Sequence, residues 1–238
     1  MPWDFWLIFL VLGVVLPWRG YRRLQNLLAI PAPTSMDRLA LYCSTIAFQW
    51  AAVAVVGWRV RAHGYSLPEL GLLVRDRRST LAASLIGAAI LATLQWFNLR
   101  RLGRLPDNLR SKFQTLAERL FPQSSLELLP FIALAVTAGI CEEFLYRGFA
   151  MAAFTRSGLS LWTVVAVSSI LFGLAHIYQG RGGFVSTLLV GIVFGMARIA
   201  YHSLVPVVVW HVAVDIVAGV AGPRFLSSRP ITAAGVQL

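Results

Sequence analysis

The chain has 238 residues, of which 58% are hydrophobic and 13% are charged, and its mean hydropathy is +0.70. A soluble domain usually has about 25% charged residues, so this composition excludes an ordinary soluble protein and indicates a polytopic membrane protein. The net charge of +11 comes from arginines and one lysine that lie mostly between the apolar runs. That placement is typical of membrane orientation and of contact with anionic lipid headgroups, and it argues against nucleic acid as a partner.

Seven apolar runs approach the length of about 20 residues that a membrane-spanning helix needs. The first is short, but it carries Asp4 where a signal peptide has basic residues, and we interpret it as an uncleaved helix. The runs lie at 3–17, 39–60, 80–99, 130–153, 159–178, 183–201 and 204–222.

A segment between the third and fourth runs has apolar residues at helical spacing with charges on the other side, namely Leu109, Phe113, Leu116 and Leu120. This pattern predicts an amphipathic helix at the membrane interface. The expected fold is therefore all-α, a polytopic transmembrane bundle of about seven helices plus this interfacial helix.

The ionisable residues at membrane depth are concentrated in the last four runs, which indicates that function lies there. We find no internal repeat and no low-complexity tract. The predicted organisation is an N-terminal part at 1–125 with transmembrane helices and the interfacial connector, a catalytic four-helix core at 126–225, and a C-terminal tail at 226–238.

The stretch GICEEFLYRGF, residues 139–149, places three ionisable side chains inside an apolar run. Each costs roughly 2.5–3.5 kcal/mol at the centre of a membrane helix unless it is paired or functional. Glu143 and Arg147 are four residues apart, which predicts a structural ion pair along one helix face. Glu142 is rotated by about 100° from Glu143 and is left without that partner.

Two further runs carry histidines at the same spacing from a second notable residue. Phe172 and His176 are four apart, and so are His211 and Asp215. Either histidine taken alone is equally well explained by a hydrogen bond between helices. Together with Glu142, these polar side chains on three runs can satisfy one another only around a common polar cavity, which would hold water.

The residue types in this cavity suit hydrolysis of a peptide bond. A carboxylate among apolar side chains can take a proton from water and return it to a leaving amine. One histidine can orient that water, and a second can stabilise the oxyanion of a tetrahedral intermediate. Alternatively, His176, His211 and a carboxylate supply the three ligands of a catalytic zinc site. Buried acids and histidines also occur in proton-coupled transporters and in non-enzymatic membrane scaffolds.

The three motifs, E-E-x-x-x-R, F-x-x-x-H and H-x-x-x-D, occur in this order on separate runs within residues 139–215. In this the chain resembles the CPBP family of intramembrane endopeptidases. That family joins the type II CAAX prenyl proteases with bacterial bacteriocin-processing and immunity proteins, also called the Abi family.

The resemblance implies a helical membrane endopeptidase in which Glu142 and His176 activate water while His211 and its partner stabilise the oxyanion. The implied catalytic residues are Glu142, Glu143, His176, His211 and Asp215, with Phe172 as motif support. The resemblance leaves open whether the enzyme uses Zn²⁺ or no metal. The candidate metal ligands are Glu142, His176, His211 and Asp215.

One residue departs from the prenyl proteases, which carry Asn where this chain has Asp215. An ionised aspartate only accepts hydrogen bonds. Asp215 is therefore expected to orient His211, to bind a metal or to stay protonated.

The implied partners are a peptide or protein substrate, prenylated or otherwise membrane-associated, and the lipid bilayer, with the protein in the bacterial cytoplasmic membrane. An immunity or scaffold protein without enzymatic activity and a proton-coupled transporter are the alternatives. One estimate of depth conflicts with a common site: at about 1.5 Å per residue, Glu142 and Asp215 lie about 16 Å from one membrane edge and His176 about 25 Å.

Overall fold

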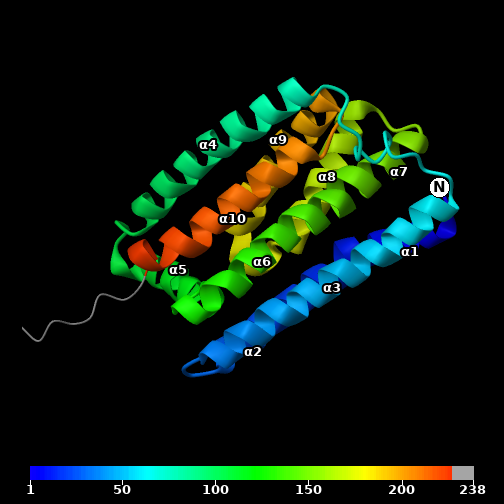
Figure 1. Ribbon diagram of the computed structural model, residues 1–238. Coiled ribbons are helices and arrows are strands. Elements are labelled where there is room, and N and C mark those ends of the chain that lie inside the picture. The colour runs from blue at the N-terminus through cyan, green and yellow to red at the C-terminus, as the bar shows by residue number, and fades with distance from the viewer. Residues whose placement is uncertain (227–238) are drawn as a thin grey trace, which may run out of the picture.

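The computed structural model describes residues 1–226, and its regular elements are all helical (Figure 1). The all-α, polytopic fold predicted from the apolar runs is confirmed. The predicted C-terminal tail at 226–238 lies almost wholly outside the described residues. The elements are α1 (Trp3–Leu10), the π-helical η1 (Val11–Val15), α2 (Leu16–Ala29), α3 (Ser35–Ala62), α4 (Arg77–Leu102), α5 (Asp107–Leu120), α6 (Ser125–Glu143), the π-helical η2 (Phe144–Ala150), α7 (Met151–Arg156), α8 (Leu161–Ala175), the 3₁₀ turn η3 (Ile177–Gln179), α9 (Gly180–Tyr201) and α10 (Val205–Leu226).

Six continuous helices in the described part of the chain are long and apolar enough to cross a membrane. Several of these helices are longer than the apolar runs and include polar residues at the ends of the runs. α1, η1 and α2, for example, form one helix that ends at Ala29 and includes three arginines. The six helices are Trp3–Ala29, Ser35–Ala62, Arg77–Leu102, Ser125–Arg156, Ile177–Tyr201 and Val205–Leu226.

The apolar run at 159–178 differs from the expectation of a seventh full span. Its helix, α8, has 15 residues, which at 1.5 Å per residue is about 22 Å, shorter than the roughly 30 Å hydrocarbon core. The chain then turns through η3 and enters α9 at Gly180, whose φ of 84° suits a glycine. The apolar runs place the boundary between these two helices at 178–183, but they do not show that the first helix already ends at Ala175.

Side-chain caps fix where several helices begin. Thr34 and Asp37 form a reciprocal capping box at the start of α3. Asp76 accepts hydrogen bonds from two backbone N–H groups at the start of α4, and Ser160 accepts one at the start of α8. Each cap satisfies backbone N–H groups of the first helical turn that have no partner within the helix.

α10 lies at the centre of one side of the bundle, against α4 and α6 and also against α5 and α9. Figure 1 shows α4, α10 and α6 running beside one another. Close approach of α6 and α10 depends on Gly139, because a Cβ there would lie 2.5 Å from Val212 Cγ2. This contact brings the acidic end of α6 next to the middle of α10.

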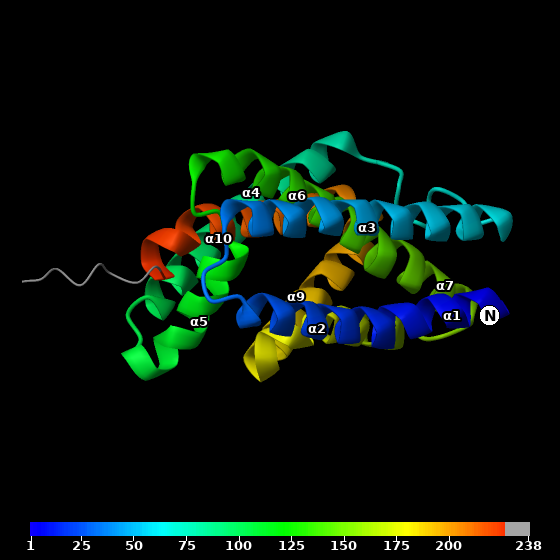
Figure 2. The same cartoon turned by 90° about the horizontal axis from the view of Figure 1, so that it is seen from below.

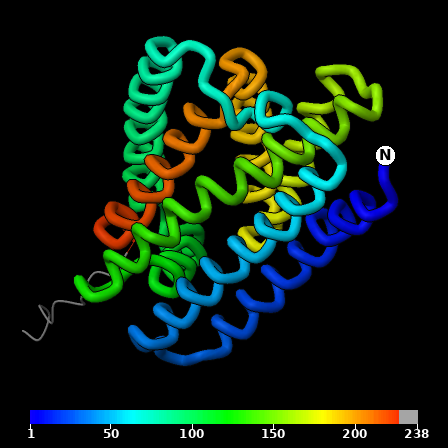
Figure 3. The backbone as a smooth tube through the Cα atoms, turned by 45° about the vertical axis from the view of Figure 1, so that its right-hand side comes forward, coloured from blue at the N-terminus to red at the C-terminus, as the bar shows by residue number. Residues whose placement is uncertain are grey.

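The continuous α1–α2 helix and α3 are joined by a short loop and run in opposite directions (Figures 2 and 3). α3 packs against α6, whereas η1 and α2 pack against α8. A buried ion pair fastens α3 to the rest of the bundle: Arg38 contacts Glu127 on α6 through two hydrogen bonds, with N–O distances of 2.7 and 2.9 Å. A partly buried pair of Arg59 on α3 with Asp4 on α1, at 2.7 Å, joins the two N-terminal helices to each other.

The predicted amphipathic helix forms as α5, Asp107–Leu120. Ala117 is buried, and α5 packs against α10, whereas Leu109 and Phe113 are exposed. The apolar face of α5 is therefore only partly covered by protein, as expected for a helix that also contacts lipid.

Candidate active site

The two glutamates of the first motif lie where α6 passes into the π-helical turn η2. π-helical turns inside α-helices occur frequently at functional sites, because they change the direction of side chains over one turn. Glu143 and Arg147 nevertheless remain in contact, and Arg147 Nη1 donates to Glu143 Oε1 at 2.9 Å. Both side chains are completely buried. This is the ion pair that the four-residue spacing predicts.

Glu142 points away from that pair and toward α3, α8 and α10. Its Oε1 accepts a hydrogen bond from Gln49 Nε2 at 2.8 Å. Its Oε2 lies 3.8 Å from Nε2 of His176 and 3.9 Å from Nε2 of His211. These separations are too long for direct hydrogen bonds, so among the described residues this oxygen has no hydrogen-bond partner.

His176 is the C-cap residue of α8 and directly follows its last residue, Ala175. Its Nδ1 lies 2.9 Å from the backbone oxygen of Phe172, and because a carbonyl oxygen only accepts, Nδ1 carries the proton. The F-x-x-x-H spacing thus has a physical basis, since the residue one turn earlier supplies both this carbonyl and a ring 4.7 Å from the imidazole. The hydrogen bond leaves Nε2 directed toward Glu142.

The estimate that placed His176 about 9 Å from the depth of Glu142 is wrong, because the two side chains approach within 4 Å. The estimate assumed that the run containing His176 crosses the whole membrane. α8 is instead a short helix that ends at Ala175. His176 is the residue that directly follows it, and it does not lie in the interior of a longer span.

His211 on α10 completes the group, and its surroundings differ from those expected. Its Nδ1 donates to Glu143 Oε1 at 2.8 Å, the same oxygen that binds Arg147. Asp215 was the expected partner, but its Oδ2 lies 3.6 Å from Nε2 of His211, beyond hydrogen-bond distance. Glu143 therefore has a second partner besides Arg147, and its hydrogen bond fixes the orientation of His211.

Arg147 is buried against two aromatic rings as well as against Glu143. Its guanidinium carbon lies 4.1 Å from the centre of the Phe172 ring and 5.6 Å from that of Phe194. Aromatic faces attract cations, and the attraction strengthens where water is absent. Phe172 thus lies between the buried cation on one side and His176 on the other, which explains why an aromatic residue fits the second motif.

The structure therefore brings together Glu142, Glu143, His176 and His211 from three separate helices, with Asp215 at the more exposed edge. Two residues that sequence reasoning missed also belong to this group. Gln49 contacts Glu142, and the ring of Tyr178 lies nearly parallel to that of His176 with centres 6.0 Å apart. A lone amide inside an apolar run was the only sequence signal for Gln49, and Tyr178 had none beyond its position two residues after the histidine.

Among residues 1–226, no group of three or more His, Cys, Asp or Glu side chains is arranged to hold a metal ion. The Nδ1 atoms of both histidines donate to oxygen atoms, which leaves Nε2 of each ring directed toward Glu142 Oε2. A metal-bound histidine commonly donates its other ring N–H in this way, so these hydrogen bonds are compatible with both alternatives, Zn²⁺ and water activated without a metal.

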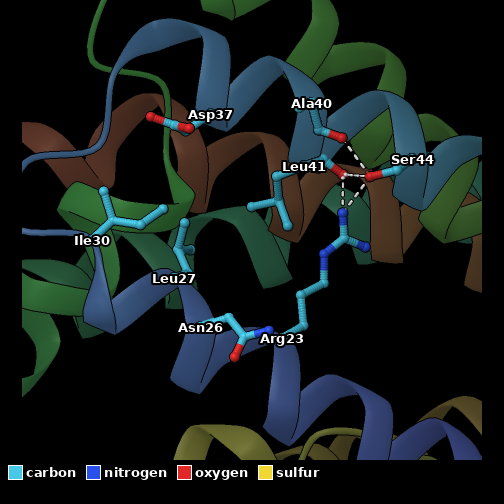
Figure 4. Close-up of a pocket in the computed structure, with 8 residues that line it drawn as sticks. All are labelled: Arg23, Asn26, Leu27, Ile30, Asp37, Ala40, Leu41 and Ser44. Atoms are coloured by element: carbon cyan, nitrogen blue, oxygen red, sulfur yellow. Dashed lines mark hydrogen bonds between the residues drawn. The ribbon is translucent and has the colours of Figure 1, made fainter.

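A separate open pocket of about 260 Å³ lies between α2 and α3. Figure 4 shows Arg23 reaching across from α2 toward Leu41 and Ser44 on α3. None of Glu142, Glu143, His176, His211 and Asp215 lines this pocket. Its lining residues are Arg23, Asn26, Leu27, Ile30, Asp37, Ala40, Leu41 and Ser44.

Comparison with known proteins supplies one match. Residues 124–217 match the family model described as type II CAAX prenyl endopeptidase Rce1-like. This segment is less than half of the chain, but it contains all three motifs. No curated protein and no solved structure matches the chain.

Proposed function

Residues 124–217 match the type II CAAX prenyl endopeptidase Rce1-like family model, and from this match we propose that the protein is an intramembrane endopeptidase of that family that uses activated water. In this proposal Glu142 and His176 activate the water, and His211 stabilises the oxyanion. The segment at 126–225 is the catalytic core. The substrate is a peptide or protein that reaches the site from the membrane, and the enzyme resides in the bacterial cytoplasmic membrane.

The observation that carries the proposal is the position of Glu142 Oε2, which lies within 4 Å of the Nε2 atoms of two histidines on different helices. Nδ1 of His176 donates to a carbonyl oxygen, so Nε2 of this neutral ring is an acceptor, as is Glu142 Oε2. Two acceptors that face each other at 3.8 Å need a donor between them. A water molecule has two protons to donate and fits this requirement.

The bond-making steps follow from these groups. Glu142 takes one proton from the water, and the water oxygen forms a bond to the carbonyl carbon of the substrate as the carbonyl π electrons move to its oxygen. His176 accepts the second hydrogen bond of the water and so orients its lone pair. When the tetrahedral intermediate collapses, the carbon–nitrogen bond breaks, and Glu142 returns the proton to the departing nitrogen.

Glu143 and Arg147 support this chemistry from behind His211. Glu143 binds Nδ1–H of His211 and is itself held by Arg147, so the ring cannot rotate without breaking a buried hydrogen bond. A proton on Nε2 would give an imidazolium between Glu143 and Asp215. Its Nε2–H would then donate to the oxyanion, which is the type of interaction that contributes most in acyl transfer.

The test is cleavage of a peptide library by the purified protein in detergent, with prenylated and unprenylated versions of each peptide. Glu142→Gln keeps the shape of the side chain but removes the base, and we expect activity to fall about 10²–10⁴-fold. Glu69→Gln, the same change in a loop outside the site, is the matched control and should retain activity.

Equal cleavage by the wild type and Glu142→Gln would refute the proposed role of Glu142. No cleavage by the wild type would favour the immunity, scaffold or transporter alternatives. A chelator added to the wild type should leave the rate unchanged, and a loss of activity restored by Zn²⁺ would overturn the metal-free mechanism. The ratio of rates for prenylated and unprenylated peptides shows whether a prenyl group is recognised.

A further inference from the structure

Gln49 contacts the site from α3, outside the segment that matches the family model. A glutamine in an apolar membrane helix needs partners for both ends of its amide. The Nε2 end has one, because it donates to Glu142 Oε1 at 2.8 Å. The Oε1 end is buried and has no hydrogen-bond partner among the described residues.

The orientation of this amide follows from the chemistry of its neighbour. An ionised carboxylate has no proton to donate, so the NH₂ group of Gln49 must face Glu142, and its carbonyl oxygen must face away. Oε1 therefore presents an acceptor on the side of the amide that does not contact Glu142. Glu142 Oε2 is also buried without a hydrogen-bond partner in residues 1–226, and it belongs to the same linked pair of side chains.

We propose that Gln49 is a positioning and substrate-binding residue, whose Nε2 fixes Glu142 and whose Oε1 accepts a hydrogen bond from a backbone N–H of the peptide substrate. This inference rests on the proposed endopeptidase function. It adds a ligand class, the peptide N–H, to a residue that none of the three motifs contains.

The dimensions of the amide limit which N–H is bound. The nitrogen and oxygen of an amide are about 2.2 Å apart, and each hydrogen bond adds about 2.9 Å. The bound N–H thus lies within about one or two extended residues of Glu142, at about 3.5 Å per residue. It therefore belongs to a peptide group next to the scissile bond.

A purely structural role for Gln49 makes a different prediction. If the amide only tied α3 to α6, its removal would lower thermal stability and would reduce the turnover of all substrates alike. Binding of one N–H instead links the effect of the substitution to one position of the substrate. The two roles are thus separated by changing the substrate and the enzyme together.

The experiment compares Gln49→Leu with Gln95→Leu, the same change in the membrane helix α4, where the glutamine contacts none of the site residues. Both are assayed on one cleavable peptide and on versions N-methylated at each backbone nitrogen near the scissile bond. We expect Gln49→Leu to lose about 10- to 100-fold in kcat/KM, as for loss of a hydrogen bond to a charged group. Gln95→Leu should match the wild type.

N-methylation at one position should impair the wild type and add no further loss in Gln49→Leu. Equal activity of Gln49→Leu and wild type, or a methylation penalty of the same size in both, would overturn the inference while leaving the endopeptidase function intact. Thermal unfolding shows whether the variant is folded. If Gln49→Leu does not fold, Gln49→Met, which has an unbranched apolar side chain of similar length, replaces it in the same comparison.

Discussion

Replacing Arg147 by methionine should destabilise the protein strongly, and a second substitution at Glu143 should recover much of the loss. Arg147 and Glu143 are both completely buried, and their ion pair is 2.9 Å long. Arg147→Met keeps a long side chain between Phe172 and Phe194 but leaves the Glu143 carboxylate without its cation.

The magnitude follows from the burial of both partners. Removing one member of a buried ion pair costs about 3–5 kcal/mol, because the other charge stays buried and unpaired. Loss of the guanidinium from the Phe172 ring, 4.1 Å away, adds up to about 2 kcal/mol. In the double variant Arg147→Met/Glu143→Gln no charge remains, and the glutamine oxygen still accepts from His211. We therefore expect the double variant to recover about 2–4 kcal/mol relative to the single one.

Cys141 supplies the assay, because its side chain is fully buried one residue before Glu142. In a Cys43→Ser background, which removes the exposed thiol, a maleimide fluorophore reports unfolding as Cys141 becomes accessible on heating. The ion-pair part of the loss, about 3–5 kcal/mol, alone corresponds to a midpoint lower by about 6–20 °C for a chain of this size. A single variant within about 2 °C of the parent, or a double variant no more stable than the single one, would refute this reasoning.

Two further predictions concern the edge of the site and the loop outside the membrane. Asp215→Asn should keep activity within about tenfold in the peptide-cleavage assay, because Asp215 makes no direct hydrogen bond to His211, and a loss as large as that of Glu142→Gln would contradict the metal-free mechanism. Arg156 lowers the pKa of Glu69 from its ordinary 4.5 to about 2, so their ion pair stabilises the folded protein fully above about pH 4.5 and progressively less as the pH falls toward 2. Both side chains are more than one-third exposed, so Glu69→Gln should lower the free energy of unfolding by at most about 1 kcal/mol at pH 7. This difference from the wild type, measured by tryptophan fluorescence during unfolding, should disappear near pH 2. A difference of the same size at pH 7 and near pH 2 would contradict the role of the ion pair.

Much of the fold could be predicted because membrane helices leave a strong signal in the sequence. Apolar runs of about 20 residues identify a spanning helix almost regardless of tertiary structure, since unpaired backbone groups are not tolerated in lipid. This signal does not give the length of the helix inside each run. α8 has 15 residues and ends at Ala175, and the chain then turns through Ile177–Gln179, which contacts α2.

The sequence predicted most of the residues that meet at the candidate site, but it did not predict the hydrogen bonds between them. Local spacing along a helix reveals pairs such as Glu143 and Arg147, which are four residues apart. Contacts between helices carry no such signal. Gln49 and Glu142 are 93 residues apart, and His211 and Glu143 are 68 apart, so the partners became evident only once α3, α6 and α10 were placed side by side.

In the proposed mechanism two adjacent glutamates have different roles, because their partners differ in charge. Glu143 forms an ion pair with Arg147 and also accepts a hydrogen bond from His211. Protonation of Glu143 would therefore break an ion pair that is completely buried. Glu142 is held by Gln49, a neutral donor that fixes its direction without cancelling its charge. The proposed mechanism uses as its general base the carboxylate that is oriented without a cation beside it. The N-terminal helix α3 contributes to this proposed role, because it places an amide and not a cation next to Glu142.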